Sequence, residues 1–86
     1  MSGSLPVRVM VLDTWEEFPL EFLPSTPVSE LKRAALARAR VRRPSSEYVV
    51  KYRGAELYEG PRTLAESGVT ANAPLIVLSR GRIPAR

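Results

Sequence analysis

Two neighbouring stretches decide the fold of this chain: YRGAEL at residues 52–57 and RTLAESGV at residues 62–69. In the first, Gly54 lacks a Cβ and permits a tight turn into a short strand at residues 56–58. In the second, residues 62–64 lead into one helical turn near residues 64–66, and Gly68 ends that turn. The two stretches therefore predict a strand, a turn, a short strand and a helical turn in succession.

Alternating segments lie on both sides of these stretches, as β-strands require. Residues 48–53 alternate tyrosine and valine against valine and cations, and residues 75–78 form a short apolar run that predicts the last strand. Near the start of the chain, residues 5–12 place three β-branched side chains on one face of a strand. The residues expected to face the core are Val7, Val9, Val11, Phe18, Leu20, Phe22, Tyr48, Val50, Tyr52, Leu75 and Val77.

The second strand, with Phe18, Leu20 and Phe22 alternating, contains Pro19. Proline has no backbone donor, so this strand is expected at an edge of the sheet, in a hairpin with the first strand. The first and last strands carry the apolar runs that suit burial, which predicts that they pair in parallel at the centre.

A single long helix is predicted from about Val28 to Arg40. Ser25 or Thr26 can cap it and Pro27 suits its first turn, while Val28, Leu31 and Ala35 recur at helical spacing. The element order then gives an α+β domain, with a mixed four- to five-stranded sheet packed on one long helix.

Composition narrows the classes of function. The 86 residues make one small domain, and 44% hydrophobic with 26% charged residues is typical of a folded chain. There is no cysteine and no histidine, and Asp13 and eight scattered glutamates form no cluster. We therefore expect no catalytic, cofactor-binding or metal-binding residues and no enzymatic activity.

The two opening stretches and PSTPVSELK at residues 24–32 give the chain a resemblance to the ubiquitin-like β-grasp family, over about Val7 to Arg82. The expected domain spans residues 7–80, with flexible tails at 1–6 and 81–86. Conjugated members of this family end in a diglycine, whereas this chain has a lone Gly81 and a terminal Arg86. Activation as a modifier or carrier would need processing to Gly81, and it remains an alternative.

Two bacterial groups of this family lack the diglycine: small proteins of type VII secretion systems and small subunits of multicomponent monooxygenases. The resemblance to them implies an accessory subunit that works with a protein partner in a bacterial cytoplasm. The longest apolar run, residues 75–78, is too short to span a bilayer, and we expect a monomer when the protein is isolated.

Strand alternation leaves an apolar group on the sheet face away from the helix. Five side chains are expected there in one exposed patch, with a charged rim: Met10, Leu12, Val49, Ile76 and Leu78, edged by Arg8, Lys51, Arg53 and Arg80. Such a surface indicates a protein interface, although a half-apolar solvent face or packing against a flanking segment is the alternative. The family resemblance implies recognition on this face too, with Lys51 where the family has a central isoleucine.

Two further features have two readings each. Trp15, in the first hairpin turn, either anchors a partner or folds back over the sheet edge. The cations at and beyond the helix end, Arg38, Arg40, Arg42 and Arg43, either contact nucleic acid or form a solvated helix end. No aromatic residue is interleaved with them, which disfavours nucleic acid as a partner.

Overall fold

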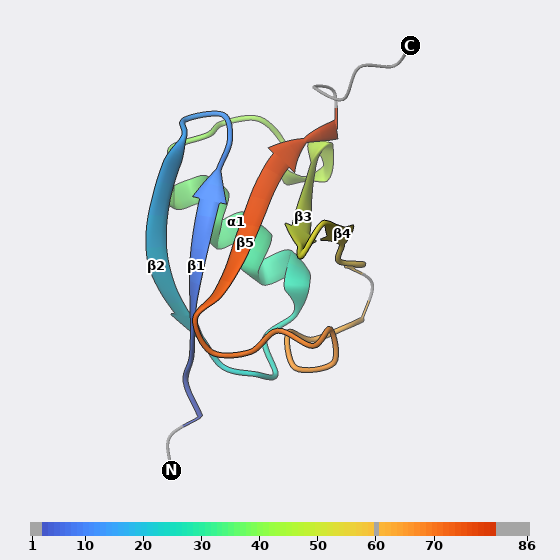
Figure 1. Ribbon diagram of the computed structural model, residues 1–86. Helices are drawn as coiled ribbons and strands as arrows, with labels where there is room; N and C mark the ends of the chain where they lie inside the picture. The colour runs from blue at the N-terminus through green and yellow to red at the C-terminus, as the bar shows by residue number, and fades with distance from the viewer. Residues whose placement is uncertain (1–2, 60, 81–86) are drawn as a thin grey trace.

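The computed structural model describes residues 3–59 and 61–80 and shows one five-stranded mixed sheet with a helix across it (Figure 1). The strands run in the order β2-β1-β5-β3-β4, with β1 and β5 parallel and the other pairs antiparallel. The elements are β1 (Leu5–Val11), β2 (Glu16–Phe22), α1 (Val28–Arg38), the 3₁₀ turn η1 (Ser45–Glu47), β3 (Tyr48–Tyr52), β4 (Ala55–Glu56) and β5 (Ala73–Ser79). The predicted α+β class, the central parallel pair and the edge position of the strand with Pro19 are confirmed.

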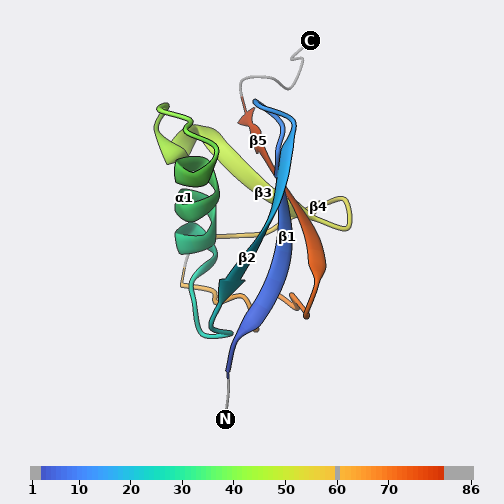
Figure 2. The ribbon, with the colours of Figure 1, turned by 90° about the vertical axis from the view of Figure 1, so that its left-hand side faces the viewer.

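The core lies between α1 and one face of the sheet, and none of the described elements forms a second layer on the other face (Figure 2). Val7, Val9 and Val11 are buried there as the alternation predicts, and so are Tyr48, Val50, Leu75 and Val77. Leu20, Phe22 and Tyr52 are only partly buried and pack against the core from its margins. From the helix, the buried apolar side chains are Val28, Leu31, Ala35, Leu36 and Ala39.

The helix is shorter than predicted and begins without the expected side-chain cap. Pro27 is the N-cap residue, and the Thr26 hydroxyl accepts a hydrogen bond from the Leu23 amide instead (3.2 Å). At the other end, Arg40 adopts a left-handed backbone with φ of 63°, and the Val41 amide donates to the Leu36 carbonyl (2.9 Å). This closing turn ends the helix at Arg38 and not at Arg40.

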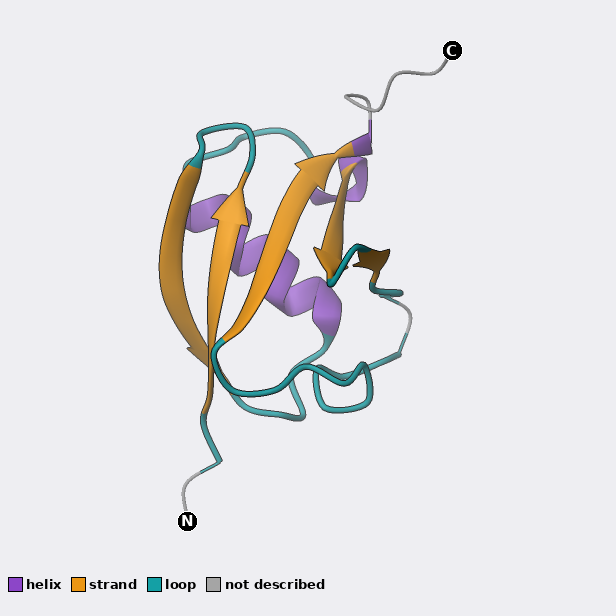
Figure 3. Ribbon diagram, viewed as in Figure 1, coloured by secondary structure: helices purple, strands orange, loops and turns teal. Residues whose placement is uncertain are grey.

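The two opening stretches fold differently in detail from the prediction (Figure 3). The short strand is Ala55–Glu56, one residue earlier than expected, and the segment after it forms hydrogen-bonded turns and not a helix. Thr63 and Glu66 stabilise these turns reciprocally: the Thr63 amide donates to the Glu66 carboxylate (3.0 Å), and the Glu66 amide donates to the Thr63 hydroxyl (3.1 Å). This arrangement holds Leu64 fully buried in the core.

One buried cation links α1 to β3 and to the segment that follows β4. The Lys32 ammonium donates to the Tyr48 carbonyl (2.9 Å) and to the Glu59 carboxylate (2.7 Å), and the Lys32 side chain is 4% exposed. The sequence pattern did not single out this residue. Its partners lie 16 and 27 residues away, where local periodicity carries no information.

The ends of the domain differ slightly from the expected boundaries. β1 begins at Leu5, within the predicted N-terminal tail, and β5 extends over Ala73–Ser79 where residues 75–78 were expected. The predicted tail at 81–86, with Gly81, lies outside the described residues. Within residues 3–59 and 61–80, no helix is long and apolar enough to cross a membrane.

Candidate functional site

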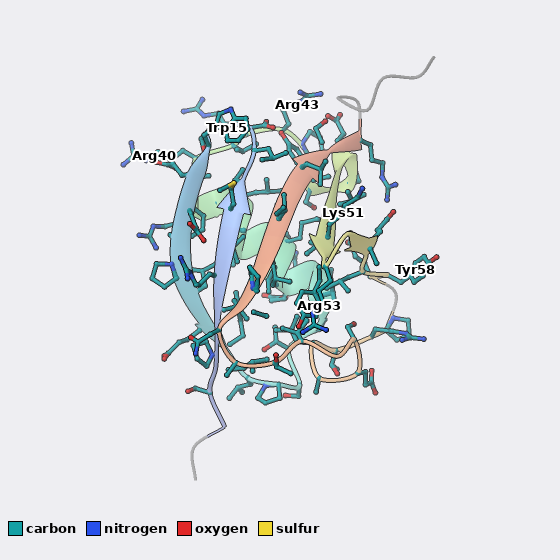
Figure 4. All side chains as sticks on the ribbon, viewed as in Figure 1. Trp15, Arg40, Arg43, Lys51, Arg53 and Tyr58 are labelled. Carbon is teal, nitrogen blue, oxygen red and sulfur yellow. The ribbon has the colours of Figure 1, made fainter. Side chains whose placement is uncertain are left out.

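The sheet face turned away from α1, here called the open face, is the side that Figure 1 and Figure 4 present to the viewer. Strand register aligns one row of side chains across the sheet. Met10 on β1 pairs with Ile76 on β5, and Ile76 pairs with Lys51 on β3. Glu17 on β2 and Glu56 on β4 end this row, because they pair with Met10 and Lys51. From β2 to β4, the row therefore consists of a carboxylate, two apolar side chains, a cation and a second carboxylate.

A second row continues the apolar surface toward the hairpin turn. Leu78 on β5 pairs with Val49 on β3, and the Leu12 amide donates to the Val77 carbonyl beside Leu78 (3.0 Å). Ile76 is 40% exposed, and Met10, Leu12 and Leu78 are half-buried. We call Met10, Leu12, Ile76 and Leu78 the open-face cluster.

The predicted exposure of Val49 is wrong, because this side chain is only 2% exposed although it lies outside the main core cluster. Arg80, just past β5, reaches the Glu56 carboxylate on β4 (3.4 Å), and β3 lies between these two strands. This ion pair therefore crosses β3, the strand to which Val49 belongs.

The four cations of the rim fall into two kinds. Arg8 pairs with Glu17 (3.4 Å) and Arg80 with Glu56 (3.4 Å). Lys51 has no ion pair among the described residues, and Arg53 instead places its guanidinium 5.4 Å from the centre of the Tyr52 ring. Lys51 and Arg53 lie on the β3 side of the face (Figure 4), so the charge available to a partner is concentrated there.

Trp15 projects from the β1–β2 turn and is 75% exposed, so it does not fold back over the sheet edge. The turn is held by amide hydrogen bonds from Thr14 to Val11 (3.3 Å) and from Trp15 to Leu12 (3.3 Å), and Trp15 has a left-handed φ of 57°. Trp15 therefore lies in the turn that follows Leu12, at the top of Figure 4.

Sequence reasoning missed a second exposed aromatic residue, Tyr58, which was assigned to the short strand. It is 73% exposed and follows the buried Leu57 at the β4 side of the sheet (Figure 4). The alternation of Leu57 inward and Tyr58 outward was a usable signal, but it covers too few residues to distinguish a strand from a loop.

The cations beyond the helix do not form one continuous basic surface. Arg38 lies over the Phe18 ring (5.0 Å), Arg43 pairs with Glu47 (2.9 Å), and Arg40 and Arg42 are exposed without an ion pair within the described parts of the chain. Phe18 is buried and covered by Arg38, so it offers no ring on which a base could stack.

The Tyr48 hydroxyl donates to the Asp13 carboxylate, and burial together with this hydrogen bond and the negative charge of Asp13 raises the pKa of Tyr48. A buried, neutral tyrosine joins β3 to the β1–β2 turn and so has a structural role. Across residues 3–59 and 61–80, no three acidic side chains gather as metal ligands.

One helix packed on a five-stranded mixed sheet with a central parallel pair defines the ubiquitin-like β-grasp fold. The chain matches the ubiquitin of Caldiarchaeum subterraneum with a TM-score of 0.77 and 19% identity, over 91% of this chain and 95% of that one. It also matches a de novo designed protein based on ubiquitin, with a TM-score of 0.74 and 25% identity, over 91% and 90% of the two chains. No protein-family model and no curated protein sequence matches the chain.

Proposed function

We propose that this domain is a non-enzymatic protein-interaction module or accessory subunit that binds its partner through the open face. The observation that carries the proposal is the row of Met10, Ile76 and Lys51 on three adjacent strands, which places two apolar side chains beside a cation that has no ion pair among the described residues. Apolar centres with charged rims are typical of protein interfaces. The ubiquitin-like fold adds general support, because it is typically non-enzymatic.

In this proposal the partner covers the open-face cluster and supplies acidic groups to Lys51 and Arg53. Burial of apolar side chains gives most of the affinity, while the cations raise the association rate of an acidic partner. Trp15, exposed beside Leu12, serves as an aromatic anchor at one margin. A cytoplasmic assembly such as a secretion apparatus or a multicomponent oxygenase would supply a partner of this kind.

Capture of partners by the immobilised domain, with Ile76→Asp as the test variant, examines the proposal directly. Ile76 is 40% exposed, so the substitution leaves the core intact while it places a charge in the middle of the open-face cluster. Leu23→Asp is a matched control, because Leu23 is a more exposed leucine (58%) that follows β2, outside the cluster. We expect Ile76→Asp to abolish capture and Leu23→Asp to preserve it. A partner that binds Ile76→Asp with full affinity would exclude the open face.

Charge reversal separates the electrostatic contribution to binding from the contribution of apolar burial. Lys51→Glu combined with Arg53→Glu is expected to lower the association rate constant and its dependence on salt, with a smaller effect on dissociation. Stopped-flow or surface-plasmon measurements at two salt concentrations provide both rate constants. An unchanged association rate would show that these cations do not steer the partner.

The competing hypothesis, a modifier or carrier processed to Gly81, is tested on the native chain. Intact-mass analysis of the protein from its own cell distinguishes the two. A mass that ends at Gly81, or adducts with other proteins, would replace the proposal by conjugation. A mass that includes Arg86 would argue for the interaction module.

A further inference from the structure

A shallow groove lies on the outer side of α1, away from the open face. Its volume is about 350 Å³, and its lining is mostly apolar. One wall is α1 and the other is the loop that leads to η1, and the lining residues are Arg33, Leu36, Ala37, Val41, Arg43 and Ser45. In Figure 2, α1 and the segment that leads to η1 lie on the same side of the sheet, opposite the open face.

Four exposed cations belong to α1 and the loop after it, namely Arg33, Arg40, Arg42 and Arg43, whereas Lys32 is buried against Glu59 and Arg38 lies over Phe18. Between Glu30 and Glu47 the sequence has six cations and two carboxylates, a net charge of +4, which equals the net charge of the whole chain. The remainder of the chain is balanced between cations and carboxylates. These exposed cations can therefore attract an acidic partner to the α1 side, in addition to the attraction by Lys51 and Arg53 on the open face.

The two arginines that line the groove form ion pairs that are exposed to solvent. Arg33 contacts Glu30 (3.0 Å) and Arg43 contacts Glu47 (2.9 Å), and all four side chains are largely exposed. Exposed ion pairs contribute little to stability, so the guanidinium groups can exchange these carboxylates for others at small cost. Arg40 and Arg42 lie in the same loop region, exposed and without an ion pair within residues 3–59 and 61–80.

We propose that this groove binds an acidic segment of a protein, which seats one leucine-like side chain on Leu36, Ala37 and Val41 and whose carboxylates accept hydrogen bonds from Arg33 and Arg43. The apolar floor favours a peptide over a nucleic acid, because no lining residue is aromatic and could stack on a base. The site lies on the opposite side of the domain from the open face, so it is independent of the function proposed above. The two sites can be occupied together.

The probe for this proposal is a fluorescein-labelled peptide, Gly-Asp-Glu-Asp-Leu-Asp-Glu-Asp-Gly. Amide chemical-shift mapping of the ¹⁵N-labelled domain is expected to show changes at Leu36, Ala37, Val41 and Ser45. Fluorescence anisotropy then measures affinity. Replacing the leucine of the peptide by alanine is expected to weaken binding about tenfold, as loss of a buried aliphatic side chain does.

Three variants of the domain sharpen the test. Arg43→Glu is expected to lower the affinity about tenfold, since an attractive contact becomes repulsive. Arg62→Glu makes the same charge change in the loop before Thr63, beyond the opposite end of α1, and is expected to change the affinity less than about twofold. Ala37→Gln fills the groove without a charge change and retains the helix, because Ala37 is exposed. It is expected to weaken binding, and thermal unfolding verifies that each variant is folded.

Several results would overturn the proposal. Shifts confined to Ile76 and Leu78 would move the peptide to the open face, and absence of binding at low salt would remove the site. Equal losses in Arg43→Glu and Arg62→Glu, or no effect of the leucine replacement, would reduce the site to unspecific attraction of polyanions. Single-stranded oligothymidylate that competes with the peptide and is equally sensitive to Ala37→Gln would assign the groove to nucleic acid instead.

Discussion

The buried pair of Lys32 and Glu59 provides a quantitative test of how this small domain is held together. The Lys32 side chain is 4% exposed and that of Glu59 is 24% exposed, so the two charges are buried unequally. Removing the lysine leaves a carboxylate that water can reach. Removing the glutamate leaves an ammonium group inside the protein with only the Tyr48 carbonyl as a neutral partner.

The two single substitutions should therefore differ in cost. Lys32→Met retains the aliphatic chain and loses hydrogen bonds of a charged group, and we expect it to lower the free energy of unfolding by about 1.5 kcal/mol. Glu59→Leu leaves the buried charge uncompensated, for which about 3 kcal/mol is expected. In a domain of this size, each kcal/mol corresponds to about 4–8 °C in Tm. Glu59→Leu is then expected to lower Tm by about 12–24 °C.

The difference in stability between the double variant and Glu59→Leu is the decisive measurement. Adding Lys32→Met to Glu59→Leu removes the buried, uncompensated ammonium, so the double variant is expected to be more stable than Glu59→Leu alone. Arg33→Met is the matched control on the same helix. Its exposed pair with Glu30 predicts a change below about 0.5 kcal/mol.

Urea and thermal unfolding followed by far-ultraviolet circular dichroism measure these differences. Tryptophan fluorescence is a poor probe here, because Trp15 is 75% exposed in the folded protein. If the double variant were less stable than Glu59→Leu, or if Lys32→Met cost as little as Arg33→Met, the pair would contribute in a way that the burial argument does not describe.

Three further predictions concern single groups. The pKa of Tyr48 is raised above its ordinary value of 10.0, mainly by burial, so its contribution to stability is fully present below pH about 10 and is lost as the pH rises through the higher pKa of the folded state. Urea titrations at alkaline pH should show a flatter loss of stability in Tyr48→Phe than in the unmodified protein, and equal slopes would contradict this. An amine-reactive acylating reagent should modify Lys51 before the buried Lys32, and peptide mass mapping that finds Lys32 modified first would refute the burial of its ammonium group. Trp15→Gly should leave the free energy of unfolding within about 0.5 kcal/mol, because relief of the left-handed backbone offsets the entropy of glycine; a larger loss in urea unfolding would show that the indole stabilises the fold.

The positions of the strands and the helix could be predicted because they depend on local periodicity. Val7, Val9 and Val11 face the core, as a two-residue repeat requires, and Pro19 lies in an edge strand because it lacks a donor. Boundaries were less accurate. Arg40 was expected in the helix, and the left-handed turn that excludes it has no marker such as glycine at that position.

The open face was anticipated as a surface but not in its composition. Strand alternation predicted Val49 in the exposed patch, yet its side chain is only 2% exposed. Lys32 is also buried against expectation, since a charged residue on a helix is expected at the surface. The ion pairs of Arg80 with Glu56 and of Lys32 with Glu59 join residues 24 and 27 positions apart in the chain, beyond the reach of local periodicity.

By itself, the sequence determined the order of elements, the edge position of β2, the apolar stripe of α1 and the side chains available on each face, because side-chain periodicity and backbone constraints act over a few residues. Only the tertiary structure decided which charges are neutralised. It buried Lys32 against Glu59, joined Arg80 to Glu56, and placed Lys51 beside Ile76 with no ion pair in residues 3–59 and 61–80. The reason is physical: Coulomb and hydrogen-bond energies depend on distances in space, which are set only once the sheet has brought remote strands together.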